Sequence, residues 1–79
     1  MSIIECVSEV LKISVEEVEK NCKVIDENLT YYWNSERGGA QLVVDKSGNY
    51  LAASSSVNLD RLVEEFKKGD KNKKFNLGE

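Results

Sequence analysis

Two cysteines are the only residues in this sequence that could form a disulfide or supply a thiolate ligand. Cys6 and Cys22 have fifteen residues between them, and the sequence contains no histidine. A tetrahedral zinc site needs four such ligands, so we expect no metal and no other cofactor. We expect both thiols to be free and buried against apolar neighbours. A disulfide between them and a reactive thiol are the alternatives.

The absence of histidine also removes the most common general base near neutral pH. Ser-His-Asp and Cys-His catalysis are thereby excluded. Aspartate and glutamate are plentiful, but no pair of them is distinguished by its position. We therefore expect no catalytic residue and a protein that is not an enzyme.

The triplet Tyr31, Tyr32 and Trp33 is the most conspicuous candidate for binding. Alternate side chains of a strand point to opposite faces, so Tyr31 and Trp33 share one side and Tyr32 takes the other. If the first two face helices, Tyr32 lies on an open sheet face near Gln41 and Tyr50. An exposed tyrosine with polar neighbours often anchors a protein interface. A purely structural role and base stacking are the alternatives.

Two basic segments are further candidates. Arg37 precedes two glycines and could help to hold an anion, although a Gly-rich phosphate site normally opens a helix, so we expect a turn. Lysines are concentrated after Gly69, where Lys71, Lys73 and Lys74 are candidates for contact with an acidic partner or a nucleic acid. A solvated, solubilising end is the alternative for this segment.

The charge balance restricts the possible partners. The 79 residues carry a net charge of −3, with −4 over residues 1–30, −2 over 31–66 and +3 over 67–79. Because phosphate neutralisation needs clustered basic residues, we do not expect the folded part to bind nucleic acid. No apolar run approaches the roughly 20 residues that span a bilayer, and the first residues do not resemble a signal peptide. We expect a cytoplasmic protein without membrane contact.

The elements that position these residues follow from capping and periodicity. Ser2 and Ser14 each begin an S-x-x-E capping box, which predicts two short N-terminal helices. Asn58 and Gly69 bracket an amphipathic C-terminal helix. Between the helices, β-prone runs predict three strands of an antiparallel meander, over residues 29–33, 40–44 and 50–54.

The predicted order is therefore α-α-β-β-β-α, an α+β fold with the helices on one face of the sheet. A chain of this length supports one hydrophobic core, so we expect a single domain over residues 1–69. Residues 70–79 are polar and rich in lysine, and we expect them to form a flexible tail.

The stretch from Gly38 to Gly69 reads as two glycines, an apolar strand, a turn at Gly48, a strand ending in serines and a helix. This layout resembles small bacterial immunity proteins, which neutralise a cognate toxin. The resemblance covers about two-fifths of the chain, and it transfers no functional residue. It implies a bacterial protein that binds a partner and has no enzymatic activity.

These observations together predict a protein-protein interaction module. We expect it to bind a partner protein, or a second copy of itself, through the open sheet face or an unpaired strand edge. The alternative is a nucleic-acid-associated accessory domain that uses the lysine-rich segment and the sheet aromatics.

Overall fold

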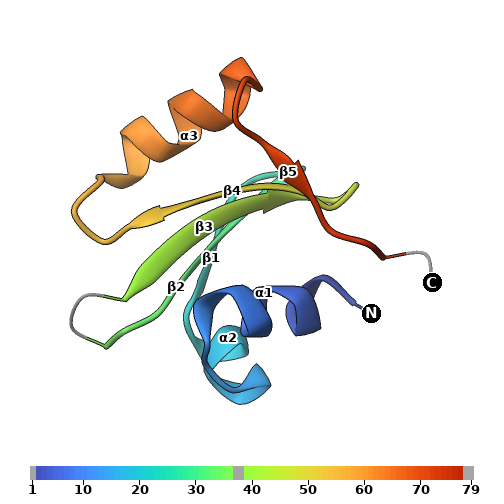
Figure 1. Ribbon diagram of the computed structural model, residues 1–79, viewed down its shortest axis with the longest axis vertical. Coiled ribbons are helices and arrows are strands. Elements are labelled where there is room, and N and C mark those ends of the chain that lie inside the picture. Colours follow the sequence, from blue (N-terminus) through green and yellow to red (C-terminus); the bar gives the residue numbers. More distant parts are fainter. Residues whose placement is uncertain (1, 37–38, 78–79) are drawn as a thin grey trace.

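The computed structural model describes residues 2–36 and 39–77, which form a twisted sheet lying between two helical layers (Figure 1). The α+β class predicted from the sequence is confirmed. The elements in chain order are α1 (Ile3–Leu11), α2 (Val15–Lys20), β1 (Cys22–Asp26), β2 (Leu29–Trp33), β3 (Ala40–Asp45), β4 (Asn49–Ser54), α3 (Leu59–Lys68) and β5 (Lys73–Lys74).

The helices begin where the sequence predicts. The Ser2 hydroxyl accepts from the Glu5 amide while the Glu5 carboxylate accepts from the Ser2 amide, which completes a capping box. The Ser14 hydroxyl caps α2 by accepting from the Glu17 amide, without the reciprocal bond from the Ser14 amide to the Glu17 carboxylate. The Asn58 side chain caps α3, and Gly69 ends that helix in the left-handed conformation.

The sheet is antiparallel throughout, with its strands in the order β1-β2-β3-β4-β5. The three predicted strands correspond to β2, β3 and β4. The prediction of a three-stranded sheet is wrong, because β1 and β5 add an edge on each side within the described residues. Neither edge strand shows a clear apolar alternation. β1 begins at Cys22, directly after α2, and β5 consists of two lysines.

The helices cover both faces of the sheet, so the expected arrangement on one face is also wrong. Tyr32, Leu42 and Val44 pack against α1 and α2 in one core layer. Val43 packs with Leu62 of α3 in the other layer. Figure 1 shows α3 on one side of the sheet and α1 with α2 on the other. The consecutive buried positions of β3 are typical of a strand that is covered on both faces.

The segment predicted to be a flexible tail is instead part of the fold as far as residue 77. Lys73 and Lys74 pair with Tyr50 and Asn49 of β4. Phe75, which is 8% exposed, enters the core layer beneath α1, and Leu77 packs beside that layer. Burial of these two apolar side chains stabilises the docked segment despite its lysines.

Candidate functional site

The predicted binding face around Tyr32 does not form. Tyr32 is 9% exposed and lies in the core layer beneath α1 and α2. Burial raises the pKa of its hydroxyl, and the neighbouring Cys22 raises that pKa further. Tyr31 and Trp33 are the half-buried members of the triplet. They stack on the α3 side with ring centroids 5.3 Å apart. Because helices cover both faces of the sheet, Tyr32 is not left on an open face.

Gln41 lies on the opposite face from Tyr32 and is 5% exposed. Its Oε1 accepts from the Tyr31 hydroxyl at 2.6 Å. Its Nε2 donates to the Ser54 carbonyl at 2.9 Å and to the Val57 carbonyl. With its amide fully engaged in this way, Gln41 holds the connection between β4 and α3 and is not available to a partner.

Tyr50, Lys71 and Lys73 are the predicted site residues that the structure does bring together. The Tyr50 ring stacks on Phe75 with centroids 3.9 Å apart and an interplanar angle of 9°. It lines a hollow together with Lys71 and Lys73. Lys74 is exposed on β5 and pairs with Asn49. Arg37, the remaining predicted site residue, lies outside the described residues.

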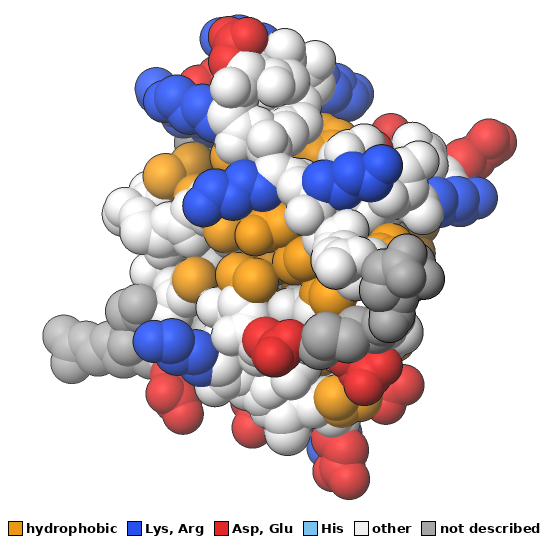
Figure 2. All heavy atoms as spheres, turned by 45° about the vertical axis from the view of Figure 1, so that its right-hand side comes forward, with side chains coloured by type: hydrophobic (Ala, Val, Ile, Leu, Met, Phe, Trp, Pro, Cys, Tyr) orange, Lys and Arg blue, Asp and Glu red, His pale blue; other side chains and the backbone are white. Residues whose placement is uncertain are grey.

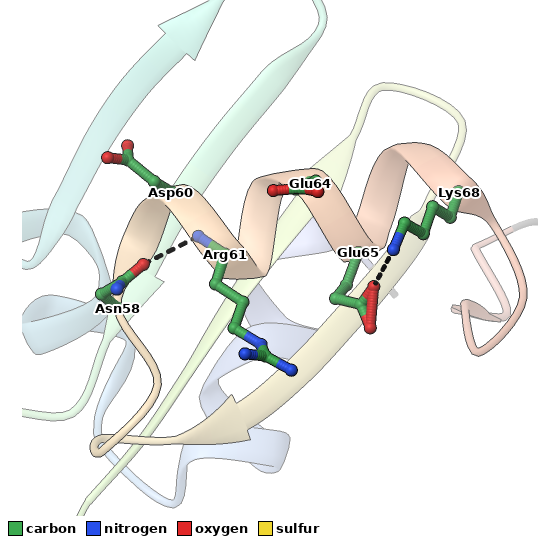
Figure 3. A pocket seen from close by; sticks show the side chains of 6 residues that line it. All are labelled: Asn58, Asp60, Arg61, Glu64, Glu65 and Lys68. Atoms are coloured by element: carbon green, nitrogen blue, oxygen red, sulfur yellow. Dashed lines mark hydrogen bonds and ion pairs between the residues drawn. The ribbon is translucent and has the colours of Figure 1, made fainter.

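A hollow of about 410 Å³ lies along the exposed side of α3 (Figure 3). Every residue that lines it belongs to α3 or to its cap. In Figure 3 these side chains fan out from one helix, and the lines mark the Asn58 cap and the ion pair between Glu65 and Lys68, whose charged atoms are 3.2 Å apart. A single element supplies all of its walls, so this hollow is the charged surface of a helix and not a cleft.

Two other hollows flank the edge of β4 and share Leu51, Ala52 and Lys71. The first, about 320 Å³, lies on the α1 side and is also lined by Val10, Tyr50 and Lys73. The second, about 240 Å³, lies on the α3 side. Its further lining residues are Ala53, Val57, Arg61, Leu62 and Glu65. We call the two hollows together the β4 groove.

Figure 2, which brings the right-hand side of Figure 1 forward, shows apolar side chains exposed in the middle of this face. Basic side chains lie along their upper border, and acidic side chains lie below them. An apolar patch with a charged border is characteristic of interaction surfaces.

The backbone of β4 is open at the floor of this groove. The Phe75 amide donates to the Gly48 carbonyl at 2.9 Å, and the register then pairs Tyr50 with Lys73. Because backbone groups alternate in an antiparallel ladder, Ala52 directs its N–H and C=O to the same outer side as Tyr50. No described residue pairs with Ala52 there.

The β5 segment leaves the edge open because it turns back toward α3. The Asn72 side-chain amide donates to the Phe66 carbonyl at 2.9 Å, which holds the chain against the end of the helix. The pairing with β4 therefore stops at Lys73. The Ser54 carbonyl already accepts from the Val57 amide and the Gln41 side chain. Ala52 is therefore the unpaired part of this edge, bordered by a hollow on each face.

The opposite edge of the sheet is protected. In β1 the register shifts between Val24 and Asp26, which marks a bulge, and the charged Lys23 lies beside it. Bulges and lysines are devices that discourage pairing at an edge. The side chain of Val24 is 70% exposed, but the neighbouring backbone is irregular. The regular, small-residue edge of β4 is therefore the better template for an added strand.

The charge of the β4 groove differs from that of the whole chain. Arg61, Lys71 and Lys73 contribute positive charge, and Glu65 is the acidic group among the lining residues. A hydrogen bond from Lys68 and its positive charge lower the pKa of Glu65. Glu65 is thus ionised and already paired, so the groove is locally basic in a protein of net charge −3.

Other site chemistry is sparse in the described ranges 2–36 and 39–77. No cluster of three aspartate, glutamate, cysteine or histidine side chains able to hold a metal is found there. Cys6 is buried, whereas Cys22 is exposed at the start of β1, so only the first matches the expected buried thiol. Among the described helices, none combines the length and apolar character needed to cross a bilayer.

Sequence reasoning missed the β4 groove because it treated the lysine-rich segment as a tail. The docked strand could have been predicted from Phe75 and Leu77, which are separated by one polar residue directly after Lys73 and Lys74. This alternation is typical of a strand. Comparison with family models, with curated proteins and with solved structures found no match to this chain.

Proposed function

We propose that this protein is a small, non-enzymatic interaction module that binds an extended segment of another protein along the edge of β4. The added segment pairs with the outward backbone groups of Ala52 and places its side chains alternately in the two hollows of the β4 groove. Strand addition of this kind draws affinity from backbone hydrogen bonds and specificity from side-chain pockets.

The unpaired edge at Ala52 is the observation that carries this proposal. The edge is regular, Ala52 has a small side chain, and the edge is bordered on both faces by hollows of 320 and 240 Å³. A toxin-neutralising role, as implied by the resemblance over Gly38 to Gly69, is one form that this function would take.

The nucleic-acid alternative receives less support from the geometry. The stacked Tyr31 and Trp33 lie on β2, whereas Lys73 lies on β5. Three strand spacings of about 4.8 Å separate β2 from β5. This aromatic pair is therefore roughly 14 Å from the lysines in the sheet. Tyr50 lies beside Lys73, but its ring is already stacked on Phe75, so the aromatic rings do not form one stacking platform with the lysines.

A backbone-methylation experiment tests the proposal without altering the protein. The probe is an uncharged peptide of alternating valine and threonine, followed by the backbone amide signals of the isotope-labelled protein. We expect perturbation centred on Ala52 and slowed hydrogen exchange of its amide. The same peptide with alternate amides N-methylated should bind roughly tenfold more weakly, because edge hydrogen bonds are lost.

Matched proline variants locate the binding edge. Ala52→Pro removes an outward N–H and leaves the ladder with β3 intact, so the variant should fold and lose peptide binding. Val24→Pro makes the corresponding change at the opposite edge and should bind normally. Equal affinity of the methylated and unmethylated peptides would overturn strand addition, as would perturbation that is absent from residues 50–54 or an absence of binding altogether.

A further inference from the structure

We infer that the segment bound by the β4 groove is acidic, with carboxylates flanking a short apolar core. This inference rests on the proposed function and adds the chemistry of the partner. The basic side chains of Arg61, Lys71 and Lys73 border the open edge, and the acidic group among the lining residues is already paired with Lys68. Arg61 and Lys71 also lie near Glu65, but three positive groups line the hollows against one negative group. A segment laid along Ala52 therefore passes close to a net positive charge.

The apolar core of the segment follows from the linings of the two hollows. Val10 and Tyr50 supply apolar surface on the α1 side, and Val57 and Leu62 supply it on the α3 side. Successive residues of a strand point to opposite faces, so two adjacent apolar side chains enter the two hollows. The methyl side chain of Ala52 leaves space for a branched residue of the partner beside it.

A second copy of this chain fits the groove less well than an acidic partner. Two-fold pairing of β4 edges through Ala52 would bring Lys71 and Lys73 of both copies to one seam. Like charges held close together across a contact oppose association. The basic border therefore favours a different protein that carries complementary charge.

Charge-matched peptides test the inference. Three fluorescent peptides share a core of two adjacent valines between threonines and carry two glutamates, two glutamines or two lysines at each end. We expect the acidic peptide to bind about fivefold more tightly than the neutral one, and the basic peptide to bind most weakly. The preference for the acidic peptide should shrink when the salt concentration rises from about 0.1 M to about 1 M, because the Debye screening length falls to about 3 Å.

Charge-reversal variants show whether the preference is local to the groove. Lys71→Glu combined with Lys73→Glu should reverse the order of the three peptides. Lys20→Glu combined with Lys23→Glu makes the same change in net charge at the opposite side of the sheet and should preserve that order. Circular dichroism of each double variant confirms that it is folded.

The possible outcomes separate the two proposals. If the three peptides bind equally, or if the control pair reverses the order, the acidic inference is wrong while strand addition stands. If no peptide binds, the proposed function itself fails. Sedimentation of the protein alone tests whether a second copy of the chain occupies the edge instead. A dimer that dissociates in the Ala52→Pro variant would show that it does, and would also overturn the inference.

Discussion

At the scale of single residues, Gln41 links the central strand to the connection that precedes α3. Its amide joins the Tyr31 hydroxyl to the carbonyls of Ser54 and Val57. Local pattern alone predicts an exposed polar residue here. The partners are 10 to 16 residues away in sequence, so only the tertiary structure reveals why a glutamine is buried at this position.

Gln41→Leu should lower the free energy of unfolding by about 1–3 kcal/mol, because it leaves buried polar partners unsatisfied. Tyr31→Phe is the matched control. It removes the hydroxyl bond but keeps both bonds from Gln41 to the carbonyls, and should cost only about 0.5–1.5 kcal/mol. Urea denaturation of the two variants compares these losses. A Gln41→Leu protein as stable as the parent would show that the network contributes nothing.

At the scale of elements, the turn between β3 and β4 and the segment after β5 stabilise each other. Gly48 has a φ of 92°, and the Leu77 side chain lies against it. The sequence predicted the turn correctly because Gly48 follows Asp45, whose carboxylate accepts from the amides of Ser47 and Asn49. It did not predict the covering segment, because that contact joins residues far apart in the chain.

Gly48→Ala should destabilise the protein more than Gly69→Ala. Both glycines have positive φ, which costs an alanine about 1 kcal/mol. A Cβ at Gly48 would also lie 2.8 Å from the Leu77 Cδ1 atom, whereas a Cβ at Gly69 meets nothing within 4 Å. Thermal unfolding ranks the variants, and the side-chain signals of Phe75 should move only in Gly48→Ala. The reverse ranking would contradict the placement of residues 73–77.

At the scale of the whole molecule, the sheet separates two core layers that share no helix. The sequence predicted all three helices and the three inner strands, because capping serines, glycines and apolar spacing act locally. The pairing of the edge strands β1 and β5, and the covering of both sheet faces by helices, depend on contacts between segments that are distant in the sequence. The consecutive Leu42, Val43 and Val44 were the one local sign that both faces of the central strand are covered.

Each layer contains a tyrosine whose pKa is raised above the ordinary value of 10.0. Partial burial raises the pKa of Tyr31, and burial together with the nearby Cys22 raises that of Tyr32. A raised pKa in the folded protein means that the unfolded chain loses this proton more readily. The neutral tyrosines therefore contribute their full stability when the pH is below their pKa in the unfolded chain. This contribution is lost as the pH rises through their higher pKa in the folded protein.

We expect the free energy of unfolding to fall above about pH 10. The fall should be smaller in a Tyr31→Phe and Tyr32→Phe double variant. Urea unfolding between neutral pH and about pH 11 gives the profile, and phenolate absorbance follows the titration directly. If the parent and the double variant show the same alkaline slope, these tyrosines do not limit stability at high pH.

Because one thiol is exposed and the other is buried, chemical labelling of the two cysteines can report on conformational changes of the protein. Cys22 lies at the β1 edge and is exposed, whereas Cys6 belongs to α1 and is buried in the core layer between that helix and the sheet. A maleimide dye should attach to Cys22 in the native protein, on the side of the sheet away from the β4 groove, and so follow binding without obstructing it. Cys6 would then react only when α1 lifts from the sheet, and its labelling rate would measure how often that layer opens.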